Sequence, residues 1–101
     1  MDKDREIERI NINLREARKI IKIHIDKFGK EIASDYQIKV PKEIIDYTKE
    51  EFDNWILSIK DKVLKVEDKL EVKSFFVVIL STYLNSLEQL KRVENKAELS
   101  K

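Results

Sequence analysis

Apolar residues recur along most of the chain at the spacing of helix faces. In residues 74–96, SFFVVILSTYLNSLEQLKRVENK, a run of six apolar residues leads into a stripe whose members lie three or four residues apart. This spacing places the side chains on one face of an α-helix. The opposite stripe is polar from Ser81 onward, and Glu88 and Arg92 are spaced as an i,i+4 ion pair. The apolar stripe of this predicted helix consists of Phe76, Leu80, Tyr83, Leu87 and Leu90.

A similar stripe predicts a first helix from about Asp2 to about Phe28. The apolar positions keep a three-four alternation over three heptads, and Gly29 suits the C-terminal end. Residues 21–25 also alternate like a strand, and isoleucine favours sheets, so a strand interpretation competes here. The stripe consists of Ile7, Ile10, Leu14, Ala17, Ile21, His24 and Phe28.

Residues 30–40 are expected to form the connection, with any remaining helix ending by about Ala33. Pro41 disfavours helix at Val40 and suits the first position of a short helical turn over residues 41–47. Thr48 and Glu51 have the spacing of a capping box, which predicts that the second main helix begins there. Its apolar stripe consists of Phe52, Ile56, Ile59, Val63 and Val66, with Trp55 beside it.

The boundary before the last helix has the weakest signal. Residues 66–71 offer an Asp68/Glu71 cap but neither glycine nor proline. A continuous helix over residues 48–96 would be about 70 Å long, which is too long for a compact monomer of this size. We therefore expect a break and two separate helices.

The scarcity of glycine and proline decides the fold class. The chain has one of each, whereas tight hairpin turns depend on them. The sequence predicts a single all-α domain over residues 1–101, a small bundle of three long helices plus a short helical turn near Pro41. The alternative is an α+β fold with short strands at 20–26, 37–40 and 74–80.

Charge and composition restrict the class of partner. A net charge of +1 argues against strong non-specific binding to nucleic acid or to an anionic membrane. The longest apolar run is far shorter than the ~20 residues of a membrane span, and the charged N-terminus does not resemble a secretory signal. We expect a cytoplasmic protein.

A chain rich in Lys and Glu and poor in Gln and Cys is typical of thermophiles, although an AT-rich genome produces a similar bias.

Most motifs that carry chemistry are missing. One glycine excludes a glycine-rich phosphate loop, and the lack of cysteine removes thiol nucleophiles and cysteine-based zinc sites. No metal-ligand spacing is present, so we expect no metal, no cofactor and no small-molecule substrate. Carboxylates are numerous, and a dyad formed by proximity stays open. We expect no catalytic residues.

One short segment resembles a known active-site pattern. Arg18 and His24 are separated by five residues, as in the all-helical HEPN ribonucleases. The resemblance covers seven residues and implies that the pair binds and protonates around a scissile phosphate. It departs from the family in lying in the first helix and in having Lys19 where the family has a polar residue. The competing interpretation is that His24 fills a core position.

A basic cluster on the first helix is a second candidate site. It consists of Arg15, Arg18, Lys19 and Lys22, whereas residues 43–53 are mainly acidic. The cluster is interpreted as a solvated face or as a partner of the acidic segment within the fold. Contact with phosphates or with an acidic protein is the alternative. No aromatic residue interleaves it, which disfavours stacking on single strands.

A surplus of apolar residues is the third feature. Val78 lies on the polar stripe of the last helix, so either the connection 30–40 or a partner is expected to cover it. We therefore predict a non-catalytic protein–protein interaction module, a small adaptor or accessory subunit that presents a helical face to itself, as a dimer, or to a larger assembly. Nucleic-acid association through the basic cluster ranks second, and a HEPN-like ribonuclease third. The interface candidates are Ile12, Ile23, Leu57, Leu64, Phe75, Val78 and Ile79.

Overall fold

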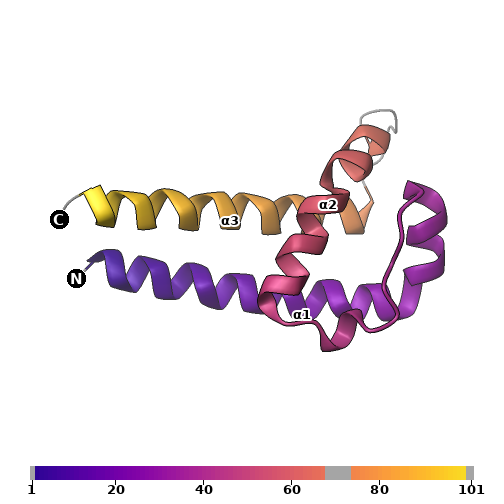
Figure 1. Ribbon diagram of the computed structural model, residues 1–101, viewed down its shortest axis with the longest axis horizontal. Helices are drawn as coiled ribbons and strands as arrows, with labels where there is room; N and C mark the ends of the chain where they lie inside the picture. The colour runs from indigo at the N-terminus through magenta and orange to yellow at the C-terminus, as the bar shows by residue number, and fades with distance from the viewer. Residues whose placement is uncertain (1, 68–73, 100–101) are drawn as a thin grey trace.

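Three long helices make up most of the computed structural model, which describes residues 2–67 and 74–99. α1 (Asp2–Tyr36) and α3 (Phe75–Leu99) run antiparallel along each other, so the two ends of the chain lie at the same end of the pair (Figure 1). α2 (Lys49–Glu67) crosses the pair on one side and follows a short 3-10 helix, η1 (Ile44–Asp46). The described ranges contain no strand, which confirms the all-α prediction and excludes the strands considered at 20–26, 37–40 and 74–80.

The core forms where the apolar stripes predicted from the sequence meet. The most extensive packing is between α1 and α3, and α2 closes the core from one side. Burial of these side chains is the main favourable term in folding. Fully or nearly fully buried members of the predicted stripes are Ile10, Leu14 and Ile21 in α1, Phe52, Ile56, Ile59 and Val63 in α2, and Phe76, Leu80 and Tyr83 in α3.

α1 is longer than the sequence predicted. The helix is kinked at Phe28 (φ −124°, ψ 20°), close to where the sequence placed its end, but it resumes and continues to Tyr36. The expectation that any remaining helix ends by about Ala33 was therefore wrong, because residues 34–36 are helical as well. The reason is that Ile32 and Tyr36, four residues apart, bury against the core and favour a further stretch of helix.

The kink also changes which side chains reach the core. Phe28 was placed on the buried stripe, but it is 46 % exposed, and His24 is only half-buried. Ile25, outside the predicted stripe, is buried instead. A stripe extrapolated with an uninterrupted helical period does not account for a local break in the backbone.

The C-terminus of α1 is closed by a Schellman motif. The Ile38 N–H donates to the Ala33 carbonyl (3.1 Å) and the Gln37 N–H donates to the Ser34 carbonyl (3.4 Å). Gln37 itself adopts φ 51°, the left-handed conformation that this motif requires and that glycine usually supplies. A glutamine at this position is strained because its Cβ approaches the backbone.

The start of α2 has the capping box that the sequence predicted. The Glu51 N–H donates to Thr48 Oγ1 (3.2 Å), and the Thr48 N–H donates to Glu51 Oε1 (3.0 Å). The predicted turn after Pro41 is also present as η1, whose first N–H, from Ile44, donates to the Pro41 carbonyl (3.4 Å). The indole of Trp55 donates to the Lys39 carbonyl (3.1 Å) and so ties the preceding segment to α2.

α2 and α3 are separate helices, as expected. α2 ends at Glu67 and α3 begins at Phe75, while the Asp68/Glu71 cap lies outside the described residues, as does the side chain of Val66. Ser74 precedes α3, and its Oγ accepts a hydrogen bond from the Val77 N–H (3.3 Å) as an N-cap does. On the exposed face of α3 the predicted Glu88–Arg92 ion pair is formed at 2.8 Å.

The two glutamines of the chain are expected to respond oppositely to the same substitution. Gln37→Gly relieves the left-handed strain and should stabilise the protein by about 0.5–1 kcal/mol. Gln89→Gly, at an exposed position inside α3, should destabilise it by about 1 kcal/mol. Urea unfolding of both variants measures the difference. A loss of stability in Gln37→Gly would contradict the backbone conformation described for the end of α1.

Candidate interaction surfaces

A group of apolar side chains surrounds His24 where α1 faces the beginning of α3. The His24 ring lies 5.0 Å from the Phe28 ring and 5.0 Å from the Phe75 ring, measured between centroids. It also stacks on Phe76, which is buried, at 6.2 Å. Phe75 is 55 % exposed, so an aromatic surface opens towards solvent at this point.

Helical spacing extends this surface along both helices. Ile20 precedes His24 by one turn of α1, and Val78 and Ile79 follow Phe75 by one turn of α3. Val78 is 50 % exposed, so the connection 30–40 does not bury it. We define the His24 patch as Ile20, Ile23, His24, Phe28, Phe75, Val78 and Ile79, of which His24 and Ile79 are half-buried and the others exposed.

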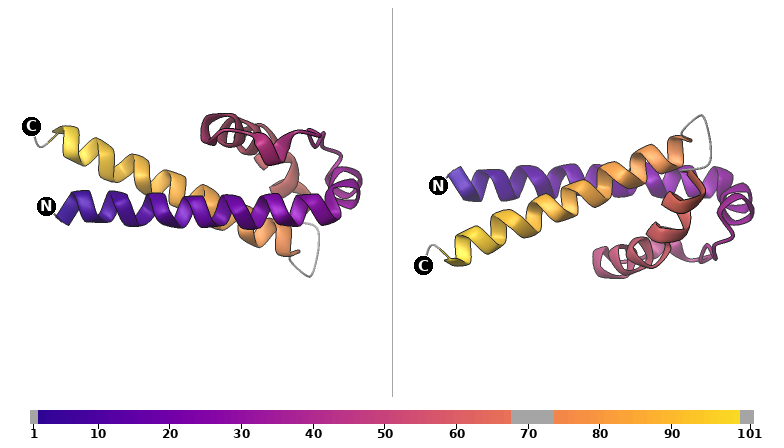
Figure 2. Two further views of the ribbon diagram at one scale, coloured as in Figure 1. Left: turned by 90° about the horizontal axis from the view of Figure 1, so that it is seen from below. Right: turned by 90° about the horizontal axis from the view of Figure 1, so that it is seen from above.

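The His24 patch lies where no described element covers the helix pair. Both views in Figure 2 place α2 and η1 on one side of α1 and the beginning of α3 on the opposite side. The His24 ring lies against aromatic side chains of α1 and α3 themselves. The patch therefore belongs to an open face of a helix pair.

The interface candidates chosen from the sequence separate into several locations. Phe75, Val78, Ile79 and Ile23 fall within the His24 patch, and Ile12 is exposed further along α1. Leu57 is exposed on α2, whereas Leu64 packs partly against the core. The sequence did not single out Ile20 as exposed, and it placed Phe28 in the core. Ile23, an interface candidate chosen from the sequence, was the signal that pointed to this part of α1, and it is 59 % exposed in the structure.

A second apolar surface is a groove of 600 Å³ between α2 and α3. Its floor is made of leucines, and lysines and carboxylates of both helices form its edges. Leu90 belongs to the core, and Leu64, Leu84 and Leu87 pack against it, so less apolar surface is free than in the His24 patch. The leucines that line the groove are Leu57, Leu64, Leu84, Leu87 and Leu90.

A buried phenol connects all three long helices. Tyr83 of α3 is fully buried, and its hydroxyl donates to Asp53 Oδ1 of α2 while it accepts from Arg18 Nη1 of α1 (3.1 Å). Burial, followed by the hydrogen bond to the Asp53 carboxylate, raises the pKa of Tyr83 well above 10, so the hydroxyl stays protonated. The arrangement is a structural link, because Tyr83 has no exposed surface from which to meet a substrate.

The basic cluster is largely occupied by contacts within the protein. Arg18 binds the Tyr83 hydroxyl, and Lys22 Nζ donates to the carbonyls of Ile45 (3.1 Å) and Tyr47 (3.0 Å). Lys19 pairs with Glu16 at 3.5 Å on the exposed face. Arg15 lines a depression that also contains Asp4 and Glu8. Two side chains of the cluster thus make their contacts inside the fold, Lys22 with backbone carbonyls of segment 43–53 and Arg18 with Tyr83, whose hydroxyl also donates to Asp53.

The structure does not assemble the ribonuclease-like pair of Arg18 and His24. Arg18 turns towards Tyr83 on the side where α2 packs, whereas His24 contacts Phe75 and Phe76. Burial lowers the pKa of His24, which favours its neutral form. The two side chains point into different surroundings and share no described partner.

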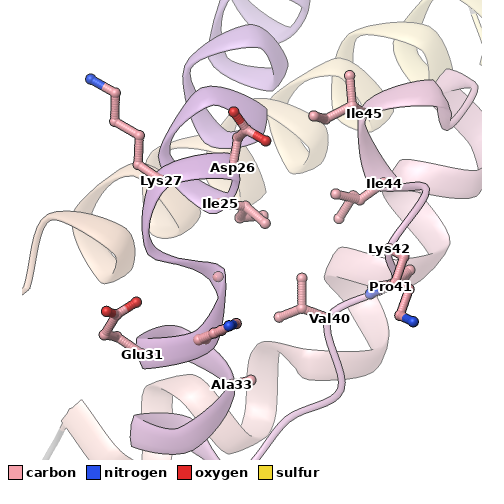
Figure 3. A pocket seen from close by; sticks show the side chains of 12 residues that line it. Ile25, Asp26, Lys27, Glu31, Ala33, Val40, Pro41, Lys42, Ile44 and Ile45 are labelled. Atoms are coloured by element: carbon pink, nitrogen blue, oxygen red, sulfur yellow. The ribbon is translucent and has the colours of Figure 1, made fainter.

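A further depression, of 490 Å³, lies between the kinked part of α1 and the segment before η1. Figure 3 shows Ile25, Val40 and Ile44 pointing towards one another across it, while Lys27 and Glu31 point away. Small-molecule sites combine an apolar wall with a few convergent polar groups. Here the charged groups do not converge, and no cluster of three or more potential metal ligands occurs among the described residues.

Comparisons with protein-family models, with curated proteins and with solved structures gave no significant match. Within the described residues, no helix combines the length and the apolar character that crossing a bilayer requires.

Removal of the Tyr83 hydroxyl should destabilise the protein. Tyr83→Phe keeps the ring in the core but leaves Asp53 and Arg18 without their shared partner, which should cost about 1–2 kcal/mol. Tyr47→Phe is a suitable control because Tyr47 is half-buried outside the core cluster proper. Equilibrium urea unfolding of both variants checks the expectation. An unchanged stability of Tyr83→Phe would show that the hydroxyl does not link the helices.

His24 should make the protein less stable at mildly acidic pH. Because burial lowers the pKa of His24 in the folded state, the unfolded chain binds the proton first as the pH falls. The contribution of neutral His24 to the free energy of unfolding is complete above pH 6.5, the unperturbed pKa. It is lost as the pH falls through the pKa of His24 in the folded state. His24→Asn should remove this component, so that the difference in unfolding free energy between pH 7.5 and pH 5 becomes smaller than in the wild type.

The lowered pKa of His24 can be measured directly by NMR. His24 is the one histidine of the chain, so its ring protons can be followed by NMR without overlap. The titration midpoint in the folded protein should lie below 6.5. A midpoint at or above that value would contradict the packing described for the ring.

Proposed function

We propose that this chain is a non-catalytic protein–protein interaction module, a small adaptor or accessory subunit that presents a helical face to a protein partner. The observation that carries the proposal is the His24 patch, a contiguous group of exposed aromatic and aliphatic side chains on the open face of α1 and α3. Exposed apolar groups of this kind are typical of interaction sites. Aromatic side chains also supply much of the binding energy at protein interfaces.

The contacts of the basic cluster favour this proposal over nucleic-acid association. Phosphate binding needs lysine and arginine side chains that are free to neutralise charge. Arg18 and Lys22 instead direct their donors to Tyr83 and to the carbonyls around η1. Lys19 has a carboxylate beside it. The number of phosphates that the basic cluster could contact is correspondingly small.

The His24 patch is also a better candidate than the groove between α2 and α3. The exposed side chains of the patch include two phenylalanines, whereas the groove is lined by leucines that already pack partly against the core. Leucine is under-represented among the residues that dominate binding energy, and aromatic residues are enriched. We place the partner at the patch and propose the cytoplasm as its compartment, in keeping with the charge pattern of the sequence.

A photo-reactive amino acid placed on α3 tests the proposal. At Val78, inside the patch, it should produce a discrete cross-linked species in extracts of the source cells. At Asn85, two helical turns further along the same face of α3, it should produce little or none. Equal cross-linking at both positions, or none at Val78, would contradict an interaction surface at the patch. The result does not depend on whether the captured protein is another copy or a different chain.

A further inference from the structure

We infer that the partner at the His24 patch is a second copy of this chain, and that two α1/α3 pairs dock through their open faces as a symmetric dimer. This inference rests on the proposed function and specifies its partner. Four observations support it: the surface area of the monomer, its elongated shape, the distribution of charge around the patch, and the layering of the helices.

The single chain exposes more surface than a compact monomer of its mass. Its accessible surface is 7555 Å² for 12.1 kDa. A typical monomer of that mass exposes about 6,000 Å², so the excess is about 1,500 Å². A stable interface buries about 800 Å² on each partner. One symmetric contact of this size would therefore bury about half of the excess surface of each copy.

The elongated shape of the chain also supports pairing through the open face of α1 and α3. The radius of gyration is 15.0 Å, and the principal extents are 47 × 30 × 18 Å. A compact domain of this length has a radius of gyration of about 13 Å. The molecule is elongated and thin because α1 and α3 are covered on one side alone by described elements (Figure 2). Doubling the thin dimension by pairing two open faces would give a shape closer to that of a globular protein.

The charge around the patch is compatible with self-association. In a symmetric interface the same surface meets itself, so a patch of one charge would repel its copy. The seven residues of the His24 patch include no acid and no lysine or arginine, and burial favours the neutral form of its histidine. The residues of α1 beside it are balanced, with Glu16 and Asp26 against Lys19 and Lys27. Such an edge can pair with its own copy, as it could not if all four charges had one sign.

The resulting layers follow the usual packing of helices. In the dimer the two α1/α3 pairs form a central four-helix layer, and each α2 stays on an outer side, where it already packs. Phe75 and Phe28 would enter the interface with about half of their surface still to be buried. His24 would lie between the aromatic rings of both copies. The known elements keep their places, so no rearrangement of the chain is needed.

Matched charge substitutions test the dimer. Phe75→Glu places a carboxylate in the patch, and Leu57→Glu places one on α2 at similar exposure, 55 % and 47 % in the single chain. By sedimentation equilibrium from micromolar to millimolar concentration, the wild type should reach twice 12.1 kDa. Phe75→Glu should weaken the dimer at least about 100-fold, because it buries an unpaired charge, and Leu57→Glu by less than about threefold.

Each result decides the question. A wild type that keeps its monomer mass at millimolar concentration overturns the inference. So does a dimer that Leu57→Glu dissociates and Phe75→Glu does not, because that dimer would use the groove. Both variants should retain the helical circular dichroism of the wild type, because both positions are about half exposed in the single chain. If Phe75→Glu loses its helix content, Phe75→Ser supplies a milder change at the same position, and it should still weaken the dimer.

Cysteine cross-linking provides an independent measurement on intact protein. The chain has no cysteine, so each single-cysteine variant carries one thiol and any disulfide joins two molecules. Under mild oxidation Val78→Cys and Phe75→Cys should give disulfide-linked dimers faster than Leu57→Cys. Equal rates at all three positions would contradict pairing through the patch. If the chain is monomeric while the photo-reactive group at Val78 still captures another protein, the interaction function stands and the second copy is excluded.

Discussion

The hydroxyl of Tyr83 is the interaction on which the arrangement of the three helices depends. A phenol that is fully buried must find hydrogen-bond partners inside the protein, because water does not reach it. Its partners come from the other two helices, Arg18 from α1 and Asp53 from α2. This link holds α2 on one particular side of the α1/α3 pair. The opposite side of the pair carries no described element, and exposed side chains of the His24 patch lie there.

The connection between α1 and α2 shows how a chain with one glycine and one proline reverses direction. Three devices replace the missing turn residues. Gln37 takes the left-handed conformation, Lys22 donates to two carbonyls around η1, and the Trp55 indole donates to the Lys39 carbonyl. Each side-chain donor satisfies a carbonyl that regular secondary structure leaves unpaired. The segment is therefore held from both sides by the helices it joins.

The sequence predicted what depends on local periodicity and capping, and failed where the fold brings distant residues together. The Thr48/Glu51 capping box and the described members of the α2 and α3 stripes are confirmed, because spacing along the chain determines them. The exposure of Phe28 was missed, because a kink alters the phase of a helix without changing the pattern of residues before it. Phe75 and Val78 were recognised as surplus, but their grouping around His24 required knowledge of how α1 and α3 align. Arg18 was considered for phosphate binding, since nothing in its neighbours along the chain indicates Tyr83.

The alignment of α1 and α3 also determines where the ends of the described chain lie relative to the patch. Both helices run the same course in opposite directions, and Lys3 Nζ donates to the Lys96 carbonyl at 3.5 Å, so the two ends are adjacent (Figure 1). The patch lies towards the other end of the pair, and the 22 residues from Phe75 to Lys96 span about 30 Å at 1.5 Å per residue. The length of the helix pair thus lies between the patch and these two ends. Anything joined to either end of it would stand about 30 Å from the patch, and two such attachments on one molecule would be held side by side.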